Sequence, residues 1–193
     1  KKQLLKREKL QEKEDNFLSF KYLKLQKRVI ITRFFFMIEV NNLSFARGNT
    51  LIYKNIYFKL RPGELLLVQG ANGVGKTTFI KFLVNSLEKI DKKNISEITS
   101  PTFSLMNQYK LNKFDIHHYD LYRLKSEKDI LSLNIFEDIS DKIVLIEWPE
   151  ILGEHKPRNT IDINFEYGEN FNSRYLTISA YEKLKIFDEF KSL

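Results

Sequence analysis

The sequence contains no cysteine among its 193 residues, which excludes disulfides, cysteine-based zinc sites and thiol catalysis. No stretch approaches the ~20 consecutive apolar residues that a membrane-spanning helix requires. Glycine is also scarce, and three of the seven glycines fall within one nonapeptide. With 42% apolar residues, the composition favours one globular domain with a substantial core, and we expect it to be cytoplasmic.

The nonapeptide GANGVGKTT, residues 70–78, has the P-loop spacing of a glycine, four residues and Gly-Lys-Thr. An apolar segment at 64–69 predicts a buried strand before it, and a helical pattern begins at Phe79. In that order, backbone N–H groups can wrap around phosphate oxygens beside the positive end of the helix dipole. Lys76 would then reach the β- and γ-phosphates, and the Thr77 hydroxyl would bind Mg²⁺. The predicted nucleotide-binding residues here are Gly70, Asn72, Gly73, Val74, Gly75, Lys76, Thr77 and Thr78.

The net charge of +7 lies entirely in the first 36 residues, which hold 11 basic and 4 acidic side chains. The remaining residues hold 21 of each sign. One interpretation is a basic arm for RNA or another anionic surface. The other is that residues 1–36 are a disordered leader or are not native protein, because Met37 stands directly before an orderly strand pattern. The P-loop ATPase domain is therefore predicted to be 37–193.

The predicted fold is α/β: a P-loop NTPase with a mixed, mainly parallel sheet and an amino-terminal β-meander. The meander rests on three short strand patterns, at 38–40, 43–46 and 56–60. After the P-loop helix, the patterns predict strands at 114–118, 143–146, 161–167 and 175–178, and helices at 125–133 and 181–193. The apolar run at 143–146 is typical of a strand covered on both faces.

Two acidic residues stand where the second half of a nucleotide site is expected. Glu147 directly follows the strand predicted at 143–146, which is the Walker-B arrangement that aims an acid at Mg²⁺ or its water. Asp120 either holds Mg²⁺, orients water or forms an ion pair with Arg123. Thr102 lies on a loop after the P-loop helix, where NTPases place a residue that senses the γ-phosphate.

The motifs GKTT, SPTFSL, HYDLYRL and LIEWPE, in this order and spacing, resemble the TsaE family. That family is the small ATPase subunit of the bacterial machinery that makes N6-threonylcarbamoyladenosine in tRNA. The resemblance covers about residues 70–178, and HxDxYR and IEWP are not generic NTPase motifs. It implies an ATP-binding, slowly hydrolysing protein that serves the threonylcarbamoyl transferase complex, with the other subunits as partners and tRNA as an indirect one.

The same resemblance implies roles for individual residues. Thr77 and Glu147 are similar to the magnesium ligands of the family, and Asp120 to a residue needed for activity that is also close to the metal. Trp148 and Arg174 are similar to residues at the nucleotide site. Catalysis would then depend on Lys76, Asp120 and Glu147.

Upstream, residues 37–78 resemble instead the start of an ABC-transporter ATPase, most like the haem-exporter ATP-binding subunit. The shared pattern includes an aromatic residue at Phe45 or Tyr53 that could stack on adenine. An ABC ATPase also needs an LSGGQ-like signature, an Asp-Glu pair and a switch histidine, and the sequence lacks all three. The predicted domain is therefore ABC-like over 37–69 and TsaE-like over 70–180. An ABC fragment on a membrane subunit and a small-molecule kinase with Asp120 as base are the alternative functions.

Overall fold

The computed structural model describes residues 37–47, 50–168 and 174–180. The predicted basic leader at 1–36 and the predicted closing helix at 181–193 lie outside the described residues. No helix within the described ranges is long and apolar enough to cross a membrane.

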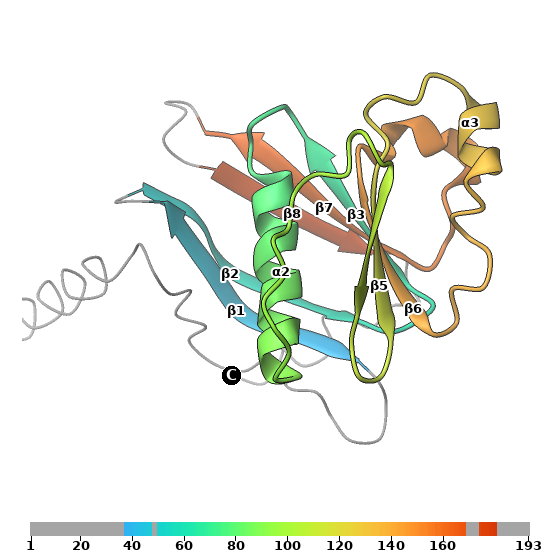
Figure 1. Ribbon diagram of the computed structural model, residues 1–193. Helices are drawn as coiled ribbons and strands as arrows, with labels where there is room; N and C mark the ends of the chain where they lie inside the picture. The colour runs from blue at the N-terminus through green and yellow to red at the C-terminus, as the bar shows by residue number, and fades with distance from the viewer. Residues whose placement is uncertain (1–36, 48–49, 169–173, 181–193) are drawn as a thin grey trace, which may run out of the picture.

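A six-stranded sheet forms the centre of the molecule, with the strand order β4-β5-β6-β3-β7-β8 (Figure 1). The four inner strands run parallel, and β4 and β8 pair antiparallel at the two edges. This arrangement confirms the mixed, mainly parallel sheet. The strands are β3 Leu65–Gly70, β4 Met106–Lys110, β5 Asp115–Asp120, β6 Lys142–Glu147, β7 Thr160–Tyr167 and β8 Arg174–Ala180.

Strand β4 is the one strand of this sheet that the sequence patterns did not predict. Its residues, MNQYK, show no regular alternation, and only Tyr109 is buried. An edge strand has a single strand neighbour and needs little apolar surface, so its sequence gives a weak signal.

Alternate residues of β3 face two separate apolar clusters. Leu66 and Val68 lie in one cluster with residues of helix α2 Lys76–Ile90, whereas Leu65 and Leu67 lie in the other. The second cluster includes Ile130 of helix α3 Glu127–Ser132 and Leu152 of the 3-10 segment η1 Pro149–His155. The inner strands are therefore covered on both faces, as the apolar run at 143–146 indicated.

The amino-terminal segment is a two-stranded hairpin, so the prediction of a three-part meander was wrong in this detail. Strands β1 Ile38–Arg47 and β2 Thr50–Leu60 pair antiparallel in a sheet of their own. The turn expected at residues 41–42 is a shift of register within β1, between Val40 and Leu43. Two asparagines suggested a turn, but the strand accommodates them as an irregularity and continues.

The hairpin lies beside one edge of the central sheet, where β2 contacts β8, and α2 crosses in front of it in Figure 1. Phe58 of β2 is buried, and its ring centroid lies 6.3 Å from that of Phe79 in α2. Phe79 also meets Phe165 of β7, at 5.7 Å between ring centroids. Helix α2 therefore has apolar contacts on two sides, which fixes the position of the loop that precedes it.

Candidate functional site

The loop between β3 and α2 has a backbone that only glycine adopts readily. Gly70, Gly73 and Gly75 have φ values of 129°, 74° and 114°. A side chain at Gly70 would also collide with the carbonyl oxygen of Phe165 on β7. Gly75 is the last residue before α2, so the loop leads directly into the amino end of the helix. This is the strand, loop and helix geometry predicted for residues 64–79.

Lys76 is folded back onto this loop. Its Nζ donates hydrogen bonds to the carbonyl oxygens of Gly70, at 2.5 Å, and Ala71, at 3.0 Å. The same nitrogen lies 3.7 Å from the centroid of the Trp148 ring. Burial lowers the pKa of the Lys76 amine, an effect opposed by the charge of Glu147. The lysine is thus a buried amine at the start of α2 that lies within the electrostatic influence of Glu147 and Asp120.

The two predicted acids come together because β5 and β6 are parallel neighbours. Asp120 and Glu147 are partners in the strand register and are the last residues of their strands. Both are buried, each with 2% of its surface exposed. Parallel strands end at the same edge of a sheet, and the P-loop begins at that edge because β3 pairs with β6.

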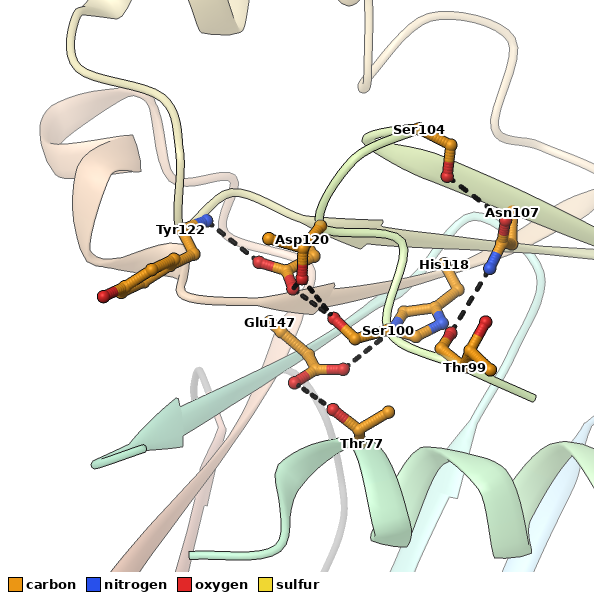
Figure 2. A network of polar contacts seen from close by, with 10 residues as sticks. Thr77, Thr99, Ser100, Ser104, Asn107, His118, Asp120, Tyr122 and Glu147 are labelled. Carbon is orange, nitrogen blue, oxygen red and sulfur yellow. Dashed lines mark hydrogen bonds and ion pairs between the residues drawn. The ribbon is translucent and has the colours of Figure 1, made fainter. Parts of the chain in front are cut away.

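The carboxylate of Glu147 is held from two directions (Figure 2). Its Oε2 accepts a hydrogen bond of 2.9 Å from the hydroxyl of Thr77, at the start of α2. Its Oε1 lies 3.0 Å from Nε2 of His118, on the neighbouring strand β5. Glu147 therefore connects the P-loop helix with the central sheet.

The carboxylate of Asp120 has a different set of partners. Its Oδ2 accepts hydrogen bonds from the hydroxyls of Ser100 and Thr102, the latter at 2.6 Å. Its Oδ1 accepts a 3.0 Å bond from the backbone N–H of Tyr122. The predicted alternative of an ion pair with Arg123 does not occur within the described residues. The Arg123 guanidinium lies over the exposed ring of Phe103, 4.7 Å from its centroid.

These groups surround one cavity of about 400 Å³ at the mouth of the P-loop. Two of its lining residues, Ser100 and Tyr122, were not among the predicted site residues. The Tyr122 ring lies 4.9 Å from the Trp148 ring, so the two aromatic side chains form one wall. The other lining residues were all predicted: Asn72, Gly73, Gly75, Lys76, Thr77, Thr78, Thr102, Asp120, Glu147 and Trp148.

Three predicted residues lie outside this lining. Val74 is buried in the apolar cluster around α2, and Gly70 lies at the close approach to β7. Arg174 of β8 stacks on Tyr167, with its guanidinium 4.2 Å from the ring centroid. The Tyr167 hydroxyl donates a 3.0 Å hydrogen bond to the carbonyl of Asn72, so Arg174 is joined to the P-loop through one intervening side chain.

Sequence reasoning did not assign a role to His118, although a signal was present. His118 and Asp120 are two residues apart, and this spacing places both on the same face of a strand. Ser100 likewise stands two residues before Thr102, and their hydroxyl oxygens are 2.8 Å apart. The HxDxYR spacing therefore encodes two site residues on β5 rather than one.

The strand order, the glycine loop between β3 and α2, and the two strand-end acids define the fold of the P-loop NTPases. The sequence model of the family described as "Threonylcarbamoyl adenosine biosynthesis protein TsaE" matches residues 48–176. The chain belongs to the TsaE family, which takes part in tRNA threonylcarbamoyladenosine biosynthesis.

Individual relatives agree with the family match. The tRNA threonylcarbamoyladenosine biosynthesis protein TsaE of Rickettsia conorii is 37% identical over 124 residues, covering 64% of this chain and 68% of that protein. The TsaE of Nostoc sp. is 37% identical over 128 residues, covering 63% and 74%. A crystal structure of Bacillus subtilus YdiB is similar with 24% identity and a TM-score of 0.46, covering 63% of this chain and 71% of that one.

The family match also begins earlier than the sequence motifs indicated. It starts at residue 48 and so includes the whole of β2 and of β3. The predicted boundary between ABC-like and TsaE-like segments, at residue 70, therefore lies inside the region that the family covers.

Proposed function

We propose that the protein binds ATP and Mg²⁺ in the P-loop cavity and hydrolyses the nucleotide slowly in support of threonylcarbamoyladenosine synthesis on tRNA. The observation that carries the proposal is the 2.9 Å hydrogen bond between the Thr77 hydroxyl and Glu147. It brings together the P-loop hydroxyl and the strand-end acid that hold the metal in P-loop NTPases.

The chemistry of the donor set fits magnesium. Mg²⁺ prefers oxygen ligands, and in nucleotide sites it usually takes one or two carboxylates, the rest coming from phosphates and water. The described residues contain no group of three or more His, Cys, Asp or Glu side chains that could hold a metal. Thr77 and Glu147 would be the protein ligands, and the metal would neutralise phosphate charge.

The cavity also fits a phosphate chain. The glycine loop can direct backbone N–H groups at phosphate oxygens, and the loop leads into the amino end of a 15-residue helix. Lys76 is already directed at the loop, and a phosphate would replace the carbonyl oxygens of Gly70 and Ala71 as its acceptor. Trp148 would flank this end of the nucleotide, because its ring covers the lysine amine.

Asp120 would position the attacking water. A carboxylate at a strand end next to Glu147 can accept a hydrogen bond from water, while the Tyr122 N–H and the hydroxyls of Ser100 and Thr102 keep it oriented. Hydrolysis of this kind depends on position and charge rather than on a covalent step by the protein. Thr102 lines the same cavity, which supports the proposal that it responds to the γ-phosphate.

The proposed hydrolysis would serve the biosynthetic pathway in which the family takes part. Family membership supports a role in threonylcarbamoyladenosine synthesis, so we propose that the partners are the other subunits of the threonylcarbamoyl transferase complex. The cavity at the P-loop offers one compartment of about 400 Å³, which supports a nucleotide switch more than a second substrate site.

The proposal is tested with purified protein and an Asp120→Ala variant. We expect wild type to bind ATP and to release phosphate slowly, with a requirement for Mg²⁺. Asp120→Ala should keep ATP affinity within a few fold and lose at least about 100-fold in turnover, because a positioned base contributes on that scale. Unchanged turnover in Asp120→Ala would contradict the role of this carboxylate, and absence of ATP binding by wild type would contradict the function.

A second experiment tests the pathway in cells. A bacterium that lacks its own TsaE should recover the modified nucleoside when it expresses this protein, and Asp120→Ala should not restore it. Phosphate transfer to added hydroxyl compounds in place of water would instead support a small-molecule kinase.

A further inference from the structure

His118 is a polar side chain that is completely buried, in a position where an apolar residue would pack at lower cost. None of its surface is exposed, and its one recorded polar contact among the described residues is the 3.0 Å pair between Nε2 and Oε1 of Glu147. Its second nitrogen, Nδ1, is buried without a hydrogen-bond partner in the described part of the chain. A buried polar group that stays partly unsatisfied calls for an explanation, and an apolar residue would avoid its cost.

The contact with Glu147 gives that explanation. Because a carboxylate oxygen accepts and cannot donate, Nε2 carries the hydrogen and donates it to Oε1. The other oxygen, Oε2, faces the Thr77 hydroxyl at 2.9 Å. Figure 2 shows the Glu147 carboxylate joined by dashed lines to His118 on β5 and to Thr77 in the first turn of α2. A glutamate has three rotatable side-chain bonds, and two contacts at opposite oxygens fix the plane that one contact would leave free.

We propose that His118 is a positioning residue that holds the carboxylate of Glu147 so that Oε2 faces the magnesium position beside Thr77. This inference rests on the proposed function for its metal and deepens the account of the same site. Metal ligands commonly depend on such outer partners, whose loss lowers metal affinity by about 10- to 100-fold. Each of the two strand-end acids is then oriented by its own hydrogen-bond donors. These are His118 for Glu147, and the hydroxyls of Ser100 and Thr102 for Asp120.

Three substitutions at this position separate positioning from packing. His118→Gln keeps a donor at about the distance of Nε2 from the backbone, because the glutamine amide nitrogen is also at the ε position. His118→Asn places its amide near the position of Nδ1, too far from Glu147. His118→Leu fills the volume without any donor. Gln and Asn are both polar amides, so their difference reports the reach of the donor even if the leucine variant fails to fold.

The first measurement is the affinity for Mg²⁺, or for Mn²⁺ by electron paramagnetic resonance, at a saturating level of a non-hydrolysable ATP analogue. We expect His118→Asn and His118→Leu to weaken metal affinity by about 10- to 100-fold and His118→Gln to stay within about threefold of wild type. Affinity for the analogue in the presence of EDTA should remain within about twofold in all three. Equal metal affinity in the Gln and Asn variants would overturn the inference.

The second measurement needs neither metal nor nucleotide. Carboxylate ¹³C and imidazole ¹⁵N resonances in the free protein should show the His118 to Glu147 hydrogen bond in wild type. The Glu147 carboxylate signal should move in the Asn and Leu variants and return toward wild type in the Gln variant. An unmoved signal in His118→Asn would overturn the positioning role even if ATP binding is demonstrated. Failure of wild type to bind ATP would refute the proposed function, while this readout still decides what His118 does.

Discussion

The two ends of the inner strands use hydrogen bonds in different ways. At the carboxyl ends of β5 and β6, side chains of separate elements bond to one another, as in the contacts of Glu147 with Thr77 and His118. At the amino ends the partners are mostly backbone groups. The Gly63 N–H donates to the carbonyl of Lys142 at 2.8 Å, and the Leu65 N–H donates to that of Asn159 at 3.0 Å.

This difference separates stability from function. Backbone bonds at the amino ends satisfy groups that folding would otherwise leave unpaired, so they support the sheet itself. Buried carboxylates at the carboxyl ends cost desolvation energy that their partners only partly return, so they are poor devices for stability. We therefore expect substitutions at the carboxyl ends to change ligand binding and turnover, and substitutions at the amino ends to change the free energy of unfolding.

The largest expected effect is an exception to this division. Gly70→Ala lies at a carboxyl end, yet it should destabilise the fold, by about 3 kcal/mol, because the residue has φ 129° and its new methyl group would collide with the Phe165 carbonyl on β7. Gly153→Ala is the matched control, since Gly153 has φ 49° but no atom within 4 Å of a new side chain. Urea unfolding of both variants measures the difference, which should be about 1–3 kcal/mol. Equal losses would mean that strain in the backbone, and not the approach to β7, requires glycine at position 70.

Lys76→Ala should have the largest effect on ligand binding. The amine is the cation of the P-loop, and the loss of a charge-assisted hydrogen bond to phosphate should weaken ATP affinity by about 100-fold, or ~2.7 kcal/mol. Stability should change less, because the hydrogen bonds of the lysine shown here go to carbonyls of its own loop. Isothermal calorimetry and thermal unfolding of the same sample provide both values. A variant that loses stability but keeps its ATP affinity would contradict the assignment of function to the carboxyl ends and stability to the amino ends.

A pair of variants that each remove one polar side-chain group compares the ends directly. Asn159→Ala removes a side-chain bond to the carbonyl of Gly63 at the amino end, and should cost about 1 kcal/mol of unfolding free energy without changing ATP turnover. Thr102→Val removes the hydroxyl that contacts Asp120 and Ser100 at the carboxyl end, and should slow turnover at nearly unchanged stability. Reversed outcomes in the two variants would refute the comparison.

The sequence predicted those site residues whose roles depend on their neighbours in the chain, and it missed those whose roles depend on strand pairing. Glu147 and the P-loop were found because each is defined by its own neighbours: an apolar strand before the acid, and glycines at fixed spacing in the loop. His118 and Ser100 were missed because their roles depend on which strand lies beside which. The register that pairs Asp120 with Glu147 puts His118 next to the same acid, and a single sequence does not state that register.

The fold was predicted to a similar extent and for similar reasons. The inner strands β3 and β6 carry apolar runs and β7 alternates, so these strands were recognised, whereas the edge strand β4 has one buried residue and no regular pattern and was not. The hairpin β1–β2 was divided into three parts because Asn41 and Asn42 favour turns locally. Pairing with β2 on both sides of these asparagines outweighed that preference.

The smallest expected effect concerns a contact that lies at the carboxyl end of a strand but, like the contacts at the amino ends, involves a backbone group. Tyr167 lies at the carboxyl end of β7, but its hydroxyl donates to a backbone carbonyl, that of Asn72, at 3.0 Å. Tyr167→Phe removes this bond and keeps the ring on which Arg174 stacks. Because the bond is solvent-accessible and holds the P-loop from outside the cavity, we expect ATP affinity to fall only about twofold, with a stability loss below about 0.5 kcal/mol. Arg174→Ala, measured alongside, should exceed that twofold loss if Arg174 contacts the nucleotide itself, and should match it if the arginine acts only by supporting Tyr167.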